Sequence, residues 1–143
     1  MDKEEPIIGI DLGTTNSCAA IYINGKTEMI PDNQQGKFII PSMICFMDNN
    51  HVVGIAAKNN FKDYPESTMF QSKRLIGQKF SNKFFKEDIK NWPVKVIEDK
   101  ETKKPKYVIK IGNEEKKNFP EDVSSMILKY LKTMLKFIIL IIK

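Results

Sequence analysis

The feature that most restricts the fold lies near the start of the sequence, where two apolar runs flank a short polar turn. Ile7–Leu12 and Cys18–Ile23 are apolar and carry β-branched residues, and residues 13–16 (Gly-Thr-Thr-Asn) lie between them. Apolar, β-branched runs on either side of a glycine-containing turn are typical of paired strands. The segment therefore predicts two strands joined by a tight turn.

The residues of this turn have the chemistry of a site for a triphosphate and a metal ion. Gly13 lets the backbone approach an anion and expose its N–H groups, and the Thr14 and Thr15 hydroxyls add short donors. Asp11, next to the turn, can hold a hydrated Mg²⁺ that neutralises phosphate charge. A Walker loop, GxxxxGK[ST] before a helix, does not occur in the sequence. For the turn alone, an ordinary hairpin with a solvated Asp11 is the simpler interpretation.

The rest of the chain predicts a mixed α/β fold. Asn24-Gly25 is a strong signal for a two-residue hairpin that leads into a third strand. Strands are predicted at residues 26–30, 38–40, 43–47 and 51–53, and helices at residues 55–61, 67–76 and 80–90. Alternating apolar and polar residues over 94–119 predict a small antiparallel meander with one solvated face. Pro120 and the two acids after it suit the first turn of a last helix.

These patterns divide the chain into three parts of one domain. Residues 1–77 hold the first sheet, the phosphate hairpin and two helices; residues 78–119 form the small antiparallel part; residues 120–143 form the last helix. Residues 137–142 are all apolar and lie between two lysines. This run is far shorter than the roughly 20 residues that a bilayer span takes. We therefore predict no membrane span, and we regard the apolar end as a candidate for self-association.

Composition excludes several classes of function. The chain has 143 residues and a net charge of +5, and all but one of its 23 basic residues are lysine. Proteins that read nucleic acids rely on the planar fork of arginine, so no nucleic-acid partner is predicted. Cys18 and Cys45 lie in apolar runs and are predicted to be free thiols, and a single histidine, His51, is too few for a zinc site. The charged residues 1–6 contain no apolar leader, so we predict a cytoplasmic location.

Five separated segments carry a resemblance to one protein family. They are Ile-Gly-Ile-Asp-Leu-Gly-Thr-Thr-Asn-Ser-Cys (8–18), Gly-Ile-Ala-Ala-Lys-Asn (54–59), Ser-Lys-Arg-Leu-Ile-Gly (72–77), Trp-Pro (92–93) and Pro-Glu-Asp-Val-Ser-Ser-Met (120–126). The first closely resembles the first phosphate motif of the 70-kilodalton heat-shock (DnaK-type) chaperones. The other four resemble landmarks of that family, in its order and at about its spacing. The resemblance covers residues 6–135 and identifies the chain as a member of this family.

The resemblance implies an incomplete actin-like (ribonuclease H-like) ATPase lobe with a small antiparallel-sheet subdomain and a C-terminal helix. In the family, two lobes close on ATP or ADP with Mg²⁺, and hydrolysis is coupled to protein folding, with unfolded client proteins and co-chaperones as partners. The implied catalytic residues are Asp11, which organises the metal through water, and Lys73, which reaches the γ-phosphate and the attacking water. The implied nucleotide-binding residues are Gly13, Thr14, Thr15, Asn16 and Lys73.

Several parts of the family's site have no counterpart in the sequence, namely the second phosphate loop (Asp-Leu-Gly-Gly-Gly-Thr), a catalytic Glu and the adenosine-binding segment. We therefore expect a truncated fragment that binds ATP weakly or not at all and does not hydrolyse it. Its first sheet is expected to expose an edge and an apolar face. Two alternatives remain open: the start of a longer active ATPase cut short by a gene-model error, and a non-enzymatic interaction module that uses residues 94–119 and the last helix. Arg74, beside Lys73, is required there for its planar fork or is there by chance.

Overall fold

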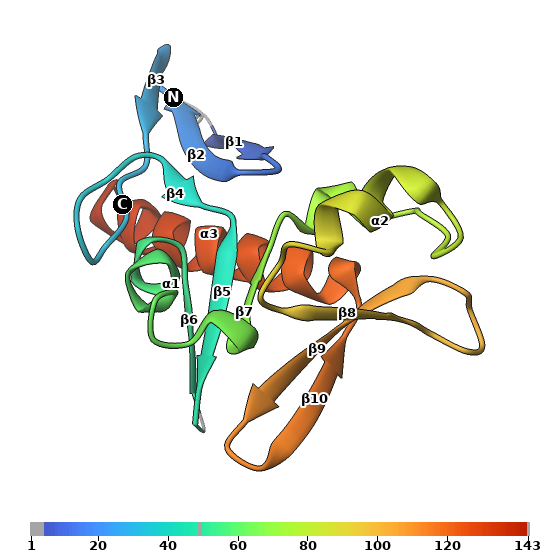
Figure 1. The fold of residues 1–143 in the computed structure, drawn as a ribbon. Coiled ribbons are helices and arrows are strands. Elements are labelled where there is room, and N and C mark those ends of the chain that lie inside the picture. Colours follow the sequence, from blue (N-terminus) through green and yellow to red (C-terminus); the bar gives the residue numbers. More distant parts are fainter. Residues whose placement is uncertain (1–4, 49, 143) are drawn as a thin grey trace.

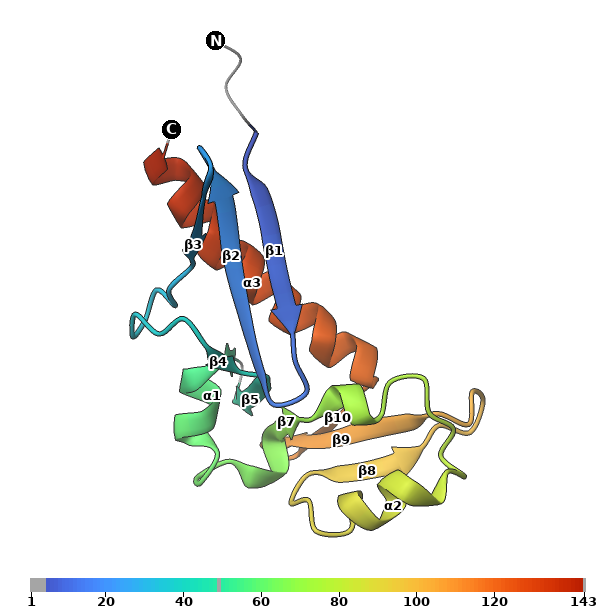
Figure 2. The same ribbon diagram turned by 90° about the horizontal axis from the view of Figure 1, so that it is seen from above.

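The computed structural model describes residues 5–48 and 50–142. Within these residues, short antiparallel sheets are arranged around one long helix, α3 (Pro120–Ile142; Figure 1). The view from above shows α3 running along the first sheet and reaching the meander at its other end (Figure 2). The mixed α/β class predicted from the sequence is confirmed.

The first sheet contains the predicted hairpin. Its strands are β1 (Ile7–Leu12), β2 (Asn16–Ile23), β3 (Lys26–Met29) and β4 (Ile40–Pro41), and β2 pairs antiparallel with each of the others. Alternate residues of β2 are buried (Ser17, Ala19 and Ile21), as expected for a strand with one covered face. The two-residue hairpin between β2 and β3 is confirmed, because Asn24 and Gly25 have φ of 51° and 73°. Positive φ at both central residues is the signature of a type I′ turn.

The second sheet is built around β5 (Met43–Met47), which lies between β6 (Asn50–Val53) and β7 (Thr68–Phe70). The helix predicted at residues 55–61 is present as α1 (Ile55–Asn60), which packs against β5. The three central residues of β5 are buried, so this short strand lies within the core (Ile44, Cys45 and Phe46).

The helix predicted at residues 67–76 is wrong. This segment contains the end of the 3₁₀ turn η1 (Pro65–Ser67), then β7, then the 3₁₀ turn η2 (Ser72–Arg74). β7 pairs with Met43, Ile44 and Cys45 of β5, so strand pairing with a distant segment overrides the helical spacing of the local sequence. Gln71, with φ of 53°, turns the chain between β7 and η2. Among its described residues, the part numbered 1–77 thus holds one α-helix where two were predicted.

The third sheet is the predicted meander. It consists of β8 (Lys95–Glu98), β9 (Pro105–Ile111) and β10 (Glu114–Asn118), with β9 in the centre. The short helix predicted before it is α2 (Lys83–Ile89), and its N-cap Asn82 accepts a hydrogen bond from the Phe84 N–H at 3.0 Å. Tyr107 of β9 is buried and donates its hydroxyl proton to the Phe70 carbonyl at 2.7 Å. This contact ties the meander to β7.

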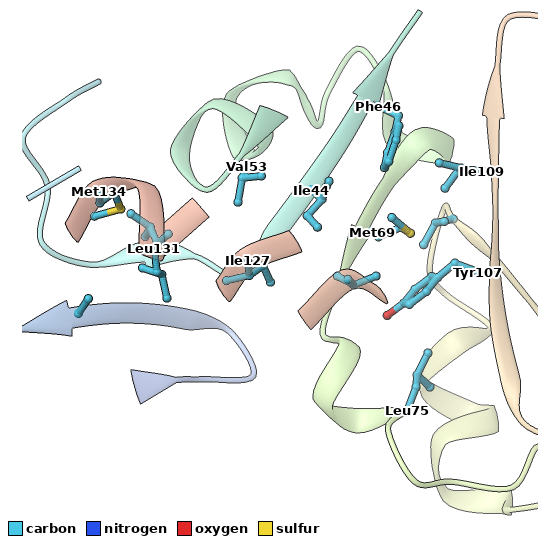
Figure 3. Close-up of a cluster of buried hydrophobic side chains, with 14 of the residues drawn as sticks. Ile44, Phe46, Val53, Met69, Leu75, Tyr107, Ile109, Ile127, Leu131 and Met134 are labelled. Carbon is cyan, nitrogen blue, oxygen red and sulfur yellow. The ribbon is translucent and has the colours of Figure 1, made fainter. Parts of the chain in front are cut away.

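Helix α3 connects the sheets. Its buried stripe is formed by Val123, Ile127, Leu131, Met134 and Leu135, at the predicted helical spacing. These residues pack against elements of all three sheets and against η2, and Figure 3 shows Ile127 facing Ile44 of β5. No helix in the described part of the chain is both long enough and apolar enough to cross a membrane.

The apolar run at residues 137–142 belongs to α3. The helix continues through it, and Ile138 and Ile139 are half-buried against the core. The other side chains of the run lie outside the described residues, so the predicted self-association of this end remains a prediction.

Candidate functional site

The turn between β1 and β2 presents the predicted nucleotide residues together. Asp11 lies opposite Cys18 in the hairpin, and the pair Leu12–Ser17 closes the turn. The side chains that would meet a ligand, those of Asp11, Thr15 and Asn16, belong to exposed residues, and Thr14 is half-buried. The hairpin thus places an acid, two hydroxyls and an amide within one short segment, open to solvent.

Gly13 is required by the tightness of this turn. A Cβ atom built on Gly13 would lie 2.0 Å from the Asn16 carbonyl oxygen and 3.2 Å from its carbonyl carbon. Both atoms are backbone, so no side-chain movement would relieve the contact. The lack of a side chain at Gly13 thus lets the two sides of the turn come close together. Its predicted role in admitting an anion to the backbone remains a prediction.

Lys73 reaches the turn from a distant part of the chain. Its Nζ donates a hydrogen bond to the Leu12 carbonyl oxygen at 2.7 Å, although the two residues are 61 positions apart. The 3₁₀ turn η2, which carries Lys73, is held by the buried Leu75 and by a hydrogen bond between the Ser72 and Ser124 hydroxyls at 3.2 Å. The structure therefore brings together the two sequence segments to which the resemblance assigns the nucleotide residues.

A third segment contacts the turn and was missed in the sequence. The Ser42 Oγ donates to the Gly13 carbonyl oxygen at 2.8 Å and lies 2.8 Å from the Ser17 Oγ, while the Ser42 N–H donates to the Thr15 carbonyl oxygen at 2.8 Å. Ser42 is 2% exposed. The only local signal was the break between two strands at Pro41-Ser42, which carries no information about the partner.

The other polar residues singled out in the sequence lie elsewhere. The Arg74 guanidinium donates to Asp88 of α2 at 3.0 Å, so it forms an exposed ion pair and makes no contact with the turn. Cys18 and Cys45 are free thiols, as predicted. Cys45 is buried in the core, and this burial raises the pKa of its thiol. Because the thiolate is the reactive form, the Cys45 thiol is expected to be unreactive.

The donor set at the turn fits a hydrated metal ion and a phosphate group. An ammonium group, two hydroxyls and backbone N–H groups of a glycine turn are donors that phosphate oxygens accept. Among the residues that the structure describes, no group of three or more His, Cys, Asp or Glu side chains is placed to hold a metal ion. A metal at Asp11 would therefore keep most of its water, which is how Mg²⁺ is commonly bound by one or two carboxylates.

Comparison with known proteins gives consistent matches. The family model described as Hsp70 protein matches residues 7–139. Over 125 residues the chain is 44% identical to the heat shock cognate 70 kDa protein 3 of Dictyostelium discoideum, covering 87% of this chain and 20% of that protein. Over 127 residues it is 42% identical to the heat shock 70 kDa protein 2 of Paracoccidioides lutzii, covering 89% of this chain and 19% of that protein. The chain thus spans about a fifth of the length of these relatives.

The matched region contains the turn, η2 and most of α3, so the similarity includes every element of the candidate site. Antiparallel sheets joined by a long C-terminal helix are consistent with part of the actin-like ATPase domain of this family. A family match over nearly the whole chain, together with relatives above 40% identity, decides the assignment. This chain belongs to the Hsp70 family.

Proposed function

We propose that this chain supplies one side of a phosphate site for Mg-ATP, and that alone it binds Mg-ATP weakly and does not hydrolyse it. The observation that carries this proposal is the contact of the Lys73 ammonium group with the Leu12 carbonyl, 2.7 Å away at the base of the turn. Lys73 is one of 23 basic residues in the sequence, so a position in solvent without a specific contact would be ordinary for it. The position of Lys73 against the Gly-Thr-Thr turn is what supports a role with phosphate.

Each residue of the site has a proposed part. Asp11 holds the waters of a magnesium ion, and the ion when bound neutralises phosphate charge. Thr14, Thr15 and Asn16 orient the phosphates through hydroxyl, amide and backbone donors. Lys73 is a compact cation that can exchange its bond to the Leu12 carbonyl for one to a phosphate oxygen.

The weakness of the isolated site follows from how phosphoryl transfer works. Catalysis of this reaction depends on positioning and on neutralising charge from several sides of the transferred group. Among the described residues, the proposed contacts come from one turn and one lysine. Contacts from one side alone leave the nucleotide free to rotate and open to water, so we expect no hydrolysis of ATP.

At the level of the family, we propose that the site belongs to ATP-driven protein folding in the cytoplasm, with unfolded client proteins and co-chaperones as partners. The similar proteins of Dictyostelium discoideum and Paracoccidioides lutzii are 70 kDa heat shock proteins by name, which supports this proposal. The turn and the segment at residues 72–77 resemble nucleotide-binding landmarks of this family, which supports the use of ATP.

Titration calorimetry of the folded chain with Mg-ATP tests the proposal. We expect a Kd of about 1 mM or weaker, which corresponds to roughly 4 kcal/mol of binding free energy. Phosphate release in the same samples should not exceed that of buffer. A tight isotherm that disappears in Lys73→Gln would contradict the proposed weakness.

Lys79→Gln is the matched control, because Lys79 is also exposed and follows Lys73 closely in the sequence. We expect Lys73→Gln to weaken the small Mg-ATP signal and Lys79→Gln to leave it unchanged. An equal loss in both variants would mean that Mg-ATP is attracted by net charge alone, and it would reject the proposed site.

A further inference from the structure

Ser42 makes more contacts to the phosphate turn than any residue outside the hairpin for which a bond is described. Its side chain and its N–H group reach two different carbonyls of the turn, those of Gly13 and Thr15, each at 2.8 Å. Ser42 is 2% exposed and lies between β4 and β5. β4 pairs with the start of β2, so Ser42 is held next to the turn by the sheet itself.

The direction of each hydrogen bond can be worked out from proton counting. A serine hydroxyl has one proton to donate and can accept from others. The Ser42 hydroxyl donates its proton to the Gly13 carbonyl. The Ser17 hydroxyl, 2.8 Å from the Ser42 Oγ, must therefore be the donor in that pair. The two serines and the Gly13 carbonyl form a directed chain of hydrogen bonds beneath the turn.

These bonds fix the orientation of two peptide groups. In a trans peptide the C=O of one residue and the N–H of the next point in opposite directions, and the described residues contain no cis peptide. Because the Gly13 carbonyl faces Ser42, the Thr14 N–H faces away from it. The same reasoning directs the Asn16 N–H away, because the Thr15 carbonyl faces the Ser42 N–H.

Ser42 is itself rigidly placed. Ile40 and Ile44, two residues before and two after it, are fully buried. Ile40 also lies under the start of α1, where a Cβ on Gly54 would be 3.3 Å from its Cβ. A side chain fixed between β4 and β5 can therefore hold the turn that it contacts in one position.

We infer that Ser42 is a positioning residue for the phosphate turn, because it holds the Gly13 and Thr15 carbonyls inward and so directs the Thr14 and Asn16 N–H groups outward to a phosphate. The inference rests on the proposed function for its ligand. The hydrogen bonds of Ser42 to the turn, in contrast, are present without nucleotide and do not depend on the proposed function. Ser42 itself makes no contact with the phosphate.

NMR of the ¹⁵N-labelled full chain tests the positioning role of Ser42 separately from the proposed binding of Mg-ATP. Backbone order parameters of residues 13–16, measured without nucleotide, report whether Ser42 orders the turn. Amide shift changes on titration with Mg-ATP then report binding. The variants are Ser42→Ala, which removes the hydroxyl, Ser42→Thr, which retains it, and Ser67→Ala, a matched control. Ser67 is also buried, and it donates its hydroxyl to the Lys110 carbonyl, far from the turn in the sequence.

We expect order parameters near 0.85 for the wild-type turn and below about 0.6 in Ser42→Ala. The initial slope of the Mg-ATP shifts should fall about tenfold, the change that corresponds to one lost hydrogen bond of ordinary strength. Ser42→Thr should restore both values, and Ser67→Ala should alter neither. Should Ser42→Ala not give a dispersed spectrum, Ser42→Cys takes its place with the same expected direction, since a thiol is a weak donor of similar size.

Unchanged order in the Ser42→Ala turn would overturn the inference, and so would an equal loss of order in Ser67→Ala, which would indicate general loosening. A wild-type chain that shows no Mg-ATP shifts would reject the proposed function. In that case a loosened turn in Ser42→Ala still supports the positioning role.

Discussion

Gly9 and Gly13 lie in the same hairpin, yet only one of them is needed for its lack of a side chain. A Cβ on Gly13 would lie 2.0 Å from the Asn16 carbonyl oxygen, whereas no atom lies within 4 Å of a Cβ on Gly9. Neither residue has positive φ. The requirement at Gly13 is therefore one of space, and it comes from the closeness of the two sides of the turn.

Gly13→Ala should accordingly destabilise the fold, while Gly9→Ala should not. We expect the free energy of unfolding to fall by about 1–3 kcal/mol in Gly13→Ala, because the methyl group must push the Asn16 backbone aside. Gly9→Ala should change it by no more than about 0.5 kcal/mol or raise it slightly, because alanine lowers the entropy of the unfolded chain. Urea denaturation followed by circular dichroism measures both. A change in Gly13→Ala as small as the one expected for Gly9→Ala would show that the turn tolerates a side chain and that the tight contact is not a constraint.

The predictability of the site differs among its residues for a physical reason. Asp11 and the turn were found because they are contiguous, and a strand–turn–strand pattern is local. Lys73 was found only through the family resemblance, since one exposed lysine in a lysine-rich chain carries no local signal. Ser42 was not found at all. Its partners lie 25 and 29 positions away, and a single short polar residue has no periodicity that reveals such a contact.

At the scale of elements, prediction succeeded where local pattern and tertiary contacts agree. Apolar residues alternate with polar ones in the meander and recur at helical spacing in α3. In both elements the tertiary contacts favour the same structure as the local sequence. β7 is the exception. Thr68–Phe70 lies in a stretch with helical spacing, and its strand conformation comes from pairing with β5, more than twenty positions earlier.

Helix α3 supplies an internal comparison of two adjacent apolar residues. Ile127 is 0% exposed and packs against the core, whereas Leu128, the next residue, is 39% exposed. Ile127→Ala should lower the free energy of unfolding by about 2–5 kcal/mol, because it leaves a cavity where the sheets meet. Leu128→Ala should cost less than about 1 kcal/mol. Similar losses for both, measured by chemical denaturation, would mean that α3 does not pack through the stripe described above.

At the scale of the whole molecule, the first sheet has an open edge. β1 pairs with β2 on one side and with no other described strand on the second. Ile7, Ile8 and Ile10 of β1 are 64%, 43% and 43% exposed. The exposed edge and apolar surface predicted from the sequence are therefore present, and such strands are a common origin of aggregation.

A charge at this edge should improve solubility. We expect Ile7→Lys to raise the protein concentration at which light scattering begins, with little change in folding stability, because Ile7 is mostly exposed already. Ile39→Lys is the matched control, since Ile39 is 61% exposed but lies outside the strands. An equal rise in this concentration for both variants would mean that net charge causes the effect and that the β1 edge does not.

The order of elements along the chain has a consequence for synthesis. The β1–β2 hairpin is made first. Ser42 and Lys73, which contact its turn, leave the ribosome later, and α3, which packs against the sheets, comes last among the described elements. Domains fold as units once their contacting segments have emerged. The apolar face of the nascent hairpin therefore stays uncovered until α3 has been made. Apolar surface that is exposed in this way during synthesis is prone to aggregate.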